Sequence, residues 1–479
     1  MSISVSGIQL TTSDPILAKS RYRTLLWAGV LGSLAGLLFG YDTSVLSGAL
    51  IYLSVDLGFH SGGLTSWDQG LVTSVLLLGA AITAFFGGQL ADKTGRRNIL
   101  RVGAFLFLVG AVASVVAPNF NWLVISRFIL GCGLGITSTV VPIYLSEIAP
   151  AASRGRLIAS NAVMINVGQL IAVVANACVS PFASWRLMFI LAAIPAVLVM
   201  IAVCFIGDTP NWYVRHNQND KARKALLKTS TAEQTEQFIA KEQAMMALES
   251  ESGKQGQLSD LFREKWLQRV LFVGVIIALI NQFTGINAVM YFTPTLLTTV
   301  GLSAQNALLA SVPIVLLGTV AAVGLGFGLM DRAPRRLVLG IGTTGVAITM
   351  AAIGWVYGLI DPSNPSVLIS WVLIALMALF LIINQGFVGA MTWTILAEIF
   401  PGHLRGLGNG LATAIIWVVN FGISLVVLPL LNSIGGRSVF WIFAAINIFA
   451  ALFVWKVLPE TRGKSLDAIE NEFRTRVEN

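Results

Sequence analysis

The sequence predicts an all-α integral membrane protein with twelve membrane-spanning helices arranged in two six-helix bundles. Of its 479 residues, 56% are hydrophobic and only 11% are charged, and the mean hydropathy is +0.79. Soluble domains carry about 25% charged residues, so this composition indicates a membrane protein. A polar stretch from about Asp208 to Arg269 divides the chain into two apolar halves of similar length. The position of this stretch predicts that the two bundles are joined outside the membrane.

Long apolar runs recur along both halves. A run of about 20 apolar residues can cross the hydrocarbon of a bilayer as a helix. Runs of this length exclude the shorter, alternating strands of a membrane barrel. The first run is too long for a cleaved signal peptide, so we expect it to be retained as a span. The runs lie near 25–50, 68–90, 98–118, 122–147, 157–180, 186–206, 268–297, 306–330, 336–358, 367–396, 407–431 and 437–457.

The basic residues gather in alternate loops between these runs. Cytoplasmic loops of membrane proteins carry an excess of Lys and Arg. The asymmetry therefore predicts a multi-pass protein of the cell inner or plasma membrane, with both termini and the polar stretch in the cytoplasm. The net charge of +8 follows from these loops and does not indicate a nucleic-acid partner. The basic loop residues include Lys93, Arg96, Arg97 and Arg101, then Arg154 and Arg156, then Arg332, Arg335 and Arg336, and then Arg405.

These segments predict four parts of the chain. They are a first six-helix bundle, 1–206, a cytoplasmic helical linker, 207–265, a second six-helix bundle, 266–457, and a cytoplasmic tail, 458–479. Within the linker, the residues from Ser230 to Glu233 fit a capping box, in which two side chains bond the first N–H groups of a helix. Good helix formers follow. We therefore expect short helices at a membrane face rather than a further span.

The sequence offers little support for an enzyme or a metal protein. The three cysteines lie in apolar runs and are odd in number, which indicates small core residues rather than disulfides. The three histidines lie far apart, so we expect no metal site. No nucleophile–base pair or phosphate-binding loop is visible. We expect no cofactor.

A repeat relates the two halves. The segment EIAPAASRG at 147–155 resembles EIFPGHLRG at 398–406, 251 positions later, and DKTGRR at 92–97 resembles DRAPRR at 331–336. Two sets of six spans in the same orientation are typical of transporters with parallel repeats. Topology signals alone would need only the cations, so the repeated acidic residues favour a gate at the cytoplasmic ends, with pairs formed across the two halves. The expected gate residues are Asp92, Arg96, Arg97, Glu147, Arg154, Asp331, Arg335, Glu398 and Arg405.

Further motifs occur in order along the chain. They are GLLFGYD in the first span, PIYLSEIAP, NQFTGINAVMYFTP, WTILAEIFP and the tail PETRGKS. Together with DKTGRR, these motifs resemble the sugar porter family of the major facilitator superfamily, and they cover nearly the whole chain. The resemblance implies the major facilitator fold and alternating-access import of a small neutral sugar or polyol. It also implies a protein that contacts membrane lipid, and we expect it to function as a monomer.

The chain departs from the family pattern at four places. After the sixth span it reads GDTPNW at 207–212 where the family usually has PESPRW. Pro334 stands where the second DRxxRR loop usually has Gly, which fixes the backbone φ angle there. Asn281 replaces the first residue of a Gln-Gln pair, and Ile416 precedes Trp417 where xylose–proton symporters have Gln. The last two changes lie where the substrate would be selected.

Amides and aromatic residues within the spans are the candidates for substrate binding. Sugar hydroxyls need paired donors and acceptors, which amides supply, and the apolar faces of a sugar pack on aromatic rings. The alternative is that these amides form hydrogen bonds between helices. The resemblance assigns Gln169, Gln282, Asn287, Trp393 and Asn420 to the sugar site, with Tyr291 nearby. Asn281 and Gln385 are further candidates beside them.

Asp42 in the first span is the candidate for proton coupling. A carboxylate at the centre of a span costs about 2.5–3.5 kcal/mol, so its presence favours a function. Sugar symporters of this family place an Arg of the fourth span close to this position, and Arg127 occupies it here. A nearby charge would tune protonation of Asp42. Animal glucose facilitators have Asn at the equivalent position, so the carboxylate favours proton symport.

These observations predict a proton-coupled symporter for a pentose, a hexose or a related polyol, with the proton as coupling ion. Three alternatives stay open. The segment LRGLGNG with IIWVVNF also resembles bacterial inositol symporters. A uniporter would use Asp42 only structurally. A non-transporting sensor on the same fold would be expected to carry a long cytoplasmic tail, whereas about twenty residues follow the last span.

Overall fold

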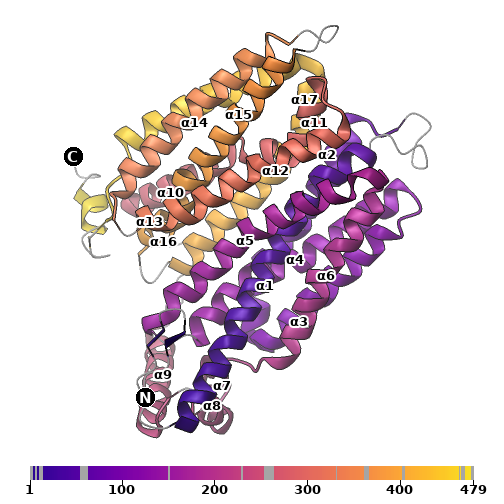
Figure 1. Ribbon diagram of the computed structural model, residues 1–479. Helices are drawn as coiled ribbons and strands as arrows, with labels where there is room; N and C mark the ends of the chain where they lie inside the picture. Colours follow the sequence, from indigo (N-terminus) through magenta and orange to yellow (C-terminus); the bar gives the residue numbers. More distant parts are fainter. Residues whose placement is uncertain are drawn as a thin grey trace.

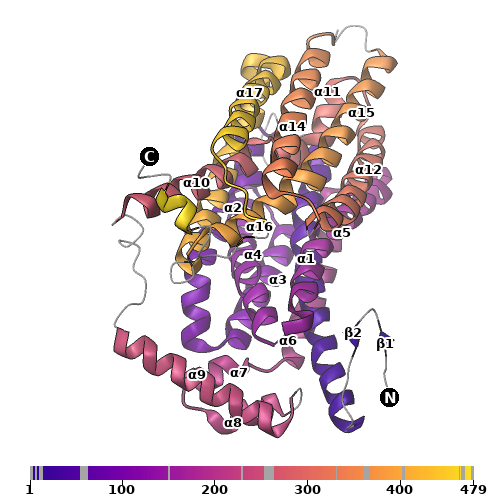
Figure 2. The same cartoon turned by 90° about the vertical axis from the view of Figure 1, so that its left-hand side faces the viewer.

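The computed structural model describes residues 4–5, 8–9, 15–53, 63–148, 151–227, 230–252, 264–330, 332–360, 366–401, 405–462, 464 and 470–475. These residues are almost wholly helical. Figures 1 and 2 show the indigo-to-magenta helices of the first half gathered in one group and the orange-to-yellow helices of the second half in another. This is the all-α arrangement expected from the two apolar halves.

The first half contains six long helices. A short antiparallel pair of strands, β1 (Ser4–Val5) and β2 (Ile8–Gln9), precedes them. The helices are α1 (Pro15–Leu53), α2 (Ser66–Thr94), α3 (Arg96–Val115), α4 (Phe120–Ile148), α5 (Ala151–Val179) and α6 (Trp185–Phe205), with a single 3-10 turn, η1 (Ser180–Phe182), before α6.

Three helices of the polar stretch lie together at one end of the molecule (Figure 2). They are α7 (Pro210–Arg215), α8 (Asn219–Leu226) and α9 (Ala232–Ser252). Val214, Leu226 and Ile239 form a small core between them. The cap of α9 differs by one residue from the expected box. Thr231 and Gln234 exchange the reciprocal hydrogen bonds, because α9 begins at Ala232 and Thr231 is therefore its cap residue.

The second half has broken helices as well as continuous ones. Its elements are α10 (Lys265–Phe283), α11 (Ile286–Thr299), α12 (Ala304–Ala321), η3 (Ala322–Gly326), α13 (Phe327–Met330), α14 (Arg335–Tyr357), α15 (Val367–Ile383), η4 (Asn384–Gly389), α16 (Ala390–Ile399) and α17 (Arg405–Lys456). Both η3 and η4 are π-helical and pack against each other. Wider π turns within α-helices often occur at functional sites.

Eleven helical segments of the described residues are long and apolar enough to cross a membrane. One of these, Leu407–Lys456, has 50 residues and contains a break at Gly435, where φ is 80° and ψ is 154°. Such a backbone is accessible mainly to glycine. Gly435 lies between the predicted runs 407–431 and 437–457, so α17 contains two segments and the described chain accounts for the twelve predicted runs. The protein is a multi-pass membrane protein.

Within the first half, α1 and α5 pack backbone to backbone. A Cβ atom built on Gly40 of α1 would lie 1.8 Å from the carbonyl oxygen of Ile165 on α5. Small residues permit such close approach of membrane helices. Asn176 of α5 is also buried against α1 and donates to the carbonyls of Ser44 and Val45 at 3.1 and 3.2 Å. This packing fixes the part of α1 that contains Asp42.

The two halves contact each other through α1 with α11, α5 with α12, and α2 with α17. At the start of α2, a Cβ on Gly70 would lie 2.3 Å from the carbonyl oxygen of Leu425 in α17. Near the same end, Asn432 of α17 donates a hydrogen bond to Ser66 of α2. These contacts join the halves at the end of the bundle opposite α7, α8 and α9, as the course of α2 in Figure 1 shows.

Candidate functional site

A buried ion pair lies between the helices of the first half. Arg127 of α4 donates from Nη1 to Oδ1 of Asp42 on α1 at 2.9 Å, and their side chains are only 3% and 1% exposed. The guanidinium also lies over the ring of Phe189 on α6, 5.6 Å from its centre. Asp42 Oδ2 and Arg127 Nε are buried without a hydrogen-bond partner. The structure thus brings together the two residues that the sequence analysis paired, and it leaves one carboxylate oxygen available for another donor.

Three candidate substrate amides surround the break between α10 and α11. Gln282 in the last turn of α10 donates to Asn281 Oδ1 at 2.9 Å, and Asn287 of α11 donates to Gln282 Oε1 at 2.6 Å. Between them, Gly285 adopts a left-handed backbone with φ 83°. The break allows side chains from two successive helices to bond each other, which no continuous helix permits over five residues. These amides are therefore linked but retain further donors and acceptors for a ligand.

Tyr291 and Asn420 form a second group of candidates in the second half. Tyr291 of α11 is buried, its hydroxyl interacts with Asn420 of α17, and it lies within the electrostatic influence of Asp42 and Arg127. Asn420 Oδ1 also accepts from the hydroxyl of Ser424 at 3.1 Å. One candidate of the second half, Tyr291, thus lies within reach of the charges of the first half's ion pair.

The remaining candidates come from α5, η4 and α16. Gln169 is half-buried on α5, where its backbone N would lie 2.9 Å from a Cβ on Gly40 of α1. Gln385 is half-buried within η4, where its side chain lies near Gly318 of α12 and Gly389. Trp393 of α16 is 51% exposed. The π-helical form of η4 was not predictable, since its composition is that of an ordinary span.

The gate residues of the first half form one cluster at the α2–α3 turn. Arg96 is buried and pairs with Asp92 at 2.6 Å and with Glu147, at the end of α4, at 3.0 Å. The hydroxyl of Thr209 donates to the other oxygen of Glu147. The guanidinium of Arg97 bonds a backbone group instead of a carboxylate: it donates to the carbonyl of Cys204 at 3.1 Å.

The second half repeats this arrangement. Arg335 of α14 pairs with Glu398 of α16 at 3.2 Å, and Thr461 donates to Glu398 at 2.5 Å. Glu460 accepts hydrogen bonds from the backbone N–H groups at the start of α14. The side chains of the other three expected gate residues, Arg154, Asp331 and Arg405, lie outside the described part of the structure.

The ion pairs described for the gate residues thus form within each half, which differs from the expected pairing across the halves. The reason is local: Arg96 and Arg335 start α3 and α14, next to the end of α4 or α16 in the same half. Four residues that bond these helix starts and glutamates were not predicted from the sequence: Asp208, Thr209, Glu460 and Thr461. A signal existed, because an acid followed by Thr occurs after both the sixth and the twelfth run.

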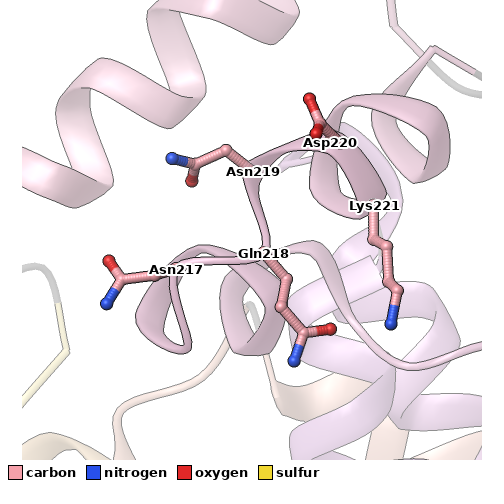
Figure 3. Close-up of a pocket in the computed structure, with 5 residues that line it drawn as sticks. All are labelled: Asn217, Gln218, Asn219, Asp220 and Lys221. Carbon is pink, nitrogen blue, oxygen red and sulfur yellow. The ribbon is translucent and has the colours of Figure 1, made fainter.

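Among the residues that the structure describes, no group of three or more His, Cys, Asp or Glu side chains is placed to hold a metal ion. A surface hollow lies at the turn between α7 and α8. In Figure 3, Asp220 points away from Gln218 and Lys221, so the polar side chains that line the hollow do not converge on a ligand. These residues are Asn217, Gln218, Asn219, Asp220 and Lys221.

Comparison with known proteins identifies the family. A family model described as "Sugar (and other) transporter" matches residues 28–473. The chain is 36% identical over 461 residues to the major myo-inositol transporter IolT of Bacillus subtilis, covering 94% of each chain. It is 34% identical over 445 residues to the galactose-proton symporter of Escherichia coli, covering 92% of each. The chain therefore belongs to the sugar transporter family of the major facilitator superfamily, whose members are membrane transporters and not enzymes.

Solved structures agree with this assignment. The structure resembles the xylose transporter XylE from E. coli in a partially occluded inward-open conformation, with a TM-score of 0.79 and 26% identity, covering 92% of this chain and all of that one. It resembles XylE bound to 6-bromo-6-deoxy-D-glucose with a TM-score of 0.75 and 26% identity, covering 95% of this chain and all of that one. The predicted major facilitator fold is confirmed.

Proposed function

We propose that this protein imports a monosaccharide or a related polyol together with a proton. The observation that carries the proposal is the buried Asp42–Arg127 pair, whose charges influence Tyr291 of the second half. A buried ion pair is costly to desolvate and gains little net stability over apolar packing. Its presence between membrane helices therefore favours a role in which the pair changes its protonation state.

The proposed coupling follows from the geometry. With Asp42 charged, Arg127 is neutralised across the α1–α4 contact at 2.9 Å. Protonation of Asp42 would remove the charge attraction and leave Arg127 free to find another acceptor. Tyr291 belongs to the second half and lies within the electrostatic influence of the pair, on a helix that packs against α1, so a change in the pair would act across the two halves. This gives the proton a route to bias a two-state carrier.

The proposed substrate site comprises the amides Gln169, Gln282, Asn287 and Asn420 and the ring of Trp393, with Tyr291, Asn281 and Gln385 as further candidates. Neutral hydroxyl compounds match this set, since amides offer both donors and acceptors. The site is independent of the carboxylate of Asp42, so substrate recognition and proton binding use different side chains. We take a monosaccharide as the substrate class, in line with the galactose-proton symporter among the relatives.

A cyclic polyol is the second candidate. The relative IolT is named as a myo-inositol transporter, and Asn281 replaces the first residue of the Gln-Gln pair at the break. Inositol has hydroxyls around its whole ring, and the shorter side chain of Asn281 would leave more room at this position. Uptake of D-xylose, D-glucose, D-galactose and myo-inositol into vesicles distinguishes these substrates.

We further propose that α7, α8 and α9 lie in the cytoplasm, as do both termini, in a plasma or inner membrane. On this orientation, the contacts of Gly70 with Leu425 and of Ser66 with Asn432 close the outer end. The structure then represents an inward-facing state, in which the ion pairs of the cytoplasmic gate form within each half rather than across the halves.

We propose the same division of the chain as the sequence predicted: two bundles, 1–206 and 266–457, a cytoplasmic linker, 207–265, and a cytoplasmic tail, 458–479.

The Asp42→Asn variant in reconstituted vesicles tests the proton coupling. One proton crossing about 100 mV supplies about 2.3 kcal/mol, which supports roughly 50-fold accumulation of a neutral substrate. The variant should still exchange labelled for unlabelled substrate, because the substrate amides are intact, but it should lose accumulation driven by a pH gradient. Accumulation by the Asn variant equal to that of the parent would reject proton coupling through Asp42 and favour the uniporter.

A further inference from the structure

Asn447 is fully buried in the second segment of α17, and its side chain reaches the break between α10 and α11. Its Nδ2 donates to the carbonyl of Phe283 at 2.9 Å and to the carbonyl of Phe443, in its own helix, at 2.8 Å. Its Oδ1 is buried without a hydrogen-bond partner. Because a half-satisfied buried amide is costly compared with an apolar side chain, the bond to Phe283 requires an explanation beyond packing.

The Phe283 carbonyl needs a donor because the helix stops there. Phe283 is the last residue of α10, and the hydrogen bonds of α11 begin with the N–H of Val289 donating to the carbonyl of Gly285 at 3.0 Å. Carbonyls at a helix end have no partner within the helix. The amide of Asn447 supplies this partner from another helix, inside the membrane-spanning part of the chain where water is scarce.

A second contact holds the same break. Gly285 has φ 83°, and a Cβ atom there would lie 2.8 Å from the terminal methyl of Met350 and 3.4 Å from the ring of Phe443. The break is therefore enclosed between α14 and the second segment of α17. Phe443 and Asn447 are one helical turn apart, so one face of α17 contacts both Phe283 and Gly285.

We infer that Asn447 is a positioning residue that fixes the bend between α10 and α11, and with it the spacing of Gln282 and Asn287; this rests on the proposed substrate site. Gln282 and Asn287 lie on opposite sides of the break and are joined by the 2.6 Å hydrogen bond. A change in the bend would move one amide relative to the other. Asn447 thereby acts on substrate affinity without touching the substrate.

Hydrogen exchange of the substrate-free protein tests the first step. In Asn447→Leu, which keeps the branched shape of the side chain but removes the donor, amides of residues 281–289 should exchange several-fold faster than in the parent. Asn161→Leu is the matched control, because Asn161 also donates to a helix carbonyl, that of Gly32 at 2.7 Å, but far from the break. The control should leave exchange at 281–289 unchanged. Unchanged exchange in Asn447→Leu overturns the inference whatever the protein transports.

Binding of D-xylose and myo-inositol tests the second step through a double-mutant cycle with Gln282→Ala. Asn447→Leu should weaken binding of the recognised compound about tenfold, which equals about 1.4 kcal/mol. Combined with Gln282→Ala, its further effect should be small, because both changes disrupt the same pair of amides. Fully additive losses would show that Asn447 acts independently of the Gln282–Asn287 pair and would overturn the inference.

A milder variant covers the case in which Asn447→Leu does not fold. Asn447→Ser introduces a hydroxyl that can bond its own helix but is too short to reach Phe283, so it should give the same two results. If Gln282→Ala itself binds every tested compound normally, the proposed substrate site fails. The exchange measurement still decides separately whether Asn447 holds the break.

Discussion

The carboxylate of Asp208 accepts a 2.8 Å hydrogen bond from the backbone N–H of Arg97, the second residue of α3. The N–H groups of the first helical turn have no partner within the helix and carry partial positive charge. A residue that follows α6 therefore caps α3 from 111 positions away. Gly95 makes this possible, since it has φ 96° and a Cβ there would lie 2.8 Å from the Asp208 carboxylate.

The second half uses the same device. Glu460 accepts from the backbone N–H groups of Arg335 and Arg336, the first two residues of α14, at 2.9 and 3.1 Å. In both halves the next residue is a threonine that bonds the glutamate at the end of α4 or α16. The chain that leaves each bundle is thus attached to the helix ends at which the charged gate residues lie.

Removing the Asp208 cap should destabilise the protein. Loss of a side-chain cap costs about 0.5–2 kcal/mol, so Asp208→Ala should unfold at a lower temperature in detergent than the parent. Asp220→Ala is the control. The Asp220 side chain is 93% exposed, and its ion pair with Arg223, at 3.6 Å, is long and solvated and therefore contributes little to stability. Equal melting temperatures for Asp208→Ala and the control would contradict the capping role.

The same carboxylate affects its neighbour in α7. Burial, followed by the negative charge of Asp208, raises the pKa of the Tyr213 phenol. The phenol must therefore stay neutral in the folded state to a higher pH than in the unfolded chain, and its contribution to stability is lost as pH rises through the folded pKa. Spectroscopic titration of Asp208→Ala should show the Tyr213 transition at lower pH than in the parent. Loss of the Asp208 charge makes the negatively charged phenolate of Tyr213 easier to form. A Tyr213 transition at the same pH in the variant and the parent would show that Asp208 does not influence this phenol.

The helical architecture was predictable because long apolar runs leave few alternatives in a membrane. Backbone N–H and C=O groups must be satisfied within each span, so each run becomes a helix. Even the break at Gly435 fell between two predicted runs. Boundaries within a run were less accessible: the π-helical η3 and η4 have the composition of ordinary spans, and their form depends on packing against each other.

The site was predictable only where one residue type had a single plausible partner. Asp42 stood out as a rare charge within a span, and the resemblance to sugar symporters implied Arg127 as its partner before the structure was known. Asp208 and Glu460 were missed because a cap normally comes from the residue next to the helix. Asn447 had no sequence signal either, since a single Asn in an apolar run is compatible with ordinary contacts between helices.

Substrate affinity should depend on the amides at the α10–α11 break. Removal of the Gln282 side chain leaves Asn287 and substrate hydroxyls unpaired, at a cost of about 1–3 kcal/mol. Gln282→Ala should therefore bind its substrate roughly 5- to 150-fold more weakly, measured by equilibrium binding of labelled sugar or inositol. Similar losses are expected for Gln169→Ala, Asn287→Ala and Trp393→Ala.

Asn166→Ala is the control for this series. The Asn166 side chain donates to the carbonyl of Ala162 in its own helix at 3.1 Å, so it contributes to α5 without contacting the other candidates. Its affinity should equal that of the parent. Parental affinity in all four site variants would mean that these amides only join helices.

The location of α9 should be readable by chemical labelling. Gln237 is exposed on this helix, and a cysteine in its place should react with a membrane-impermeant maleimide only after the cells are opened. Ser433→Cys, exposed at the opposite end of the bundle, should react in intact cells. The native cysteines are replaced in both variants. Labelling of Gln237→Cys from outside would invert the proposed orientation.

Alternating access should require separation of α2 from α17 at the end opposite α9. Ser66 and Asn432 are hydrogen-bonded across the two halves there, and Gly70 lies against Leu425 one turn further along α2. Cysteines at positions 66 and 432, in a protein without its native cysteines, should form a disulfide under mild oxidation. The cross-link should stop transport, since the halves could no longer part at this end, and reduction should restore it.

Each single cysteine variant is the control, and its transport should be insensitive to the oxidant. The cross-linked protein should still bind substrate presented from the α9 side, because the α10–α11 break is not altered by a bond between α2 and α17. Charge removal at Asp92, which pairs with Arg96 at the α9 end, should change accessibility at that end instead. Continued transport by the fully cross-linked protein would show that α2 and α17 do not separate during the cycle, and would exclude this contact as an outer gate.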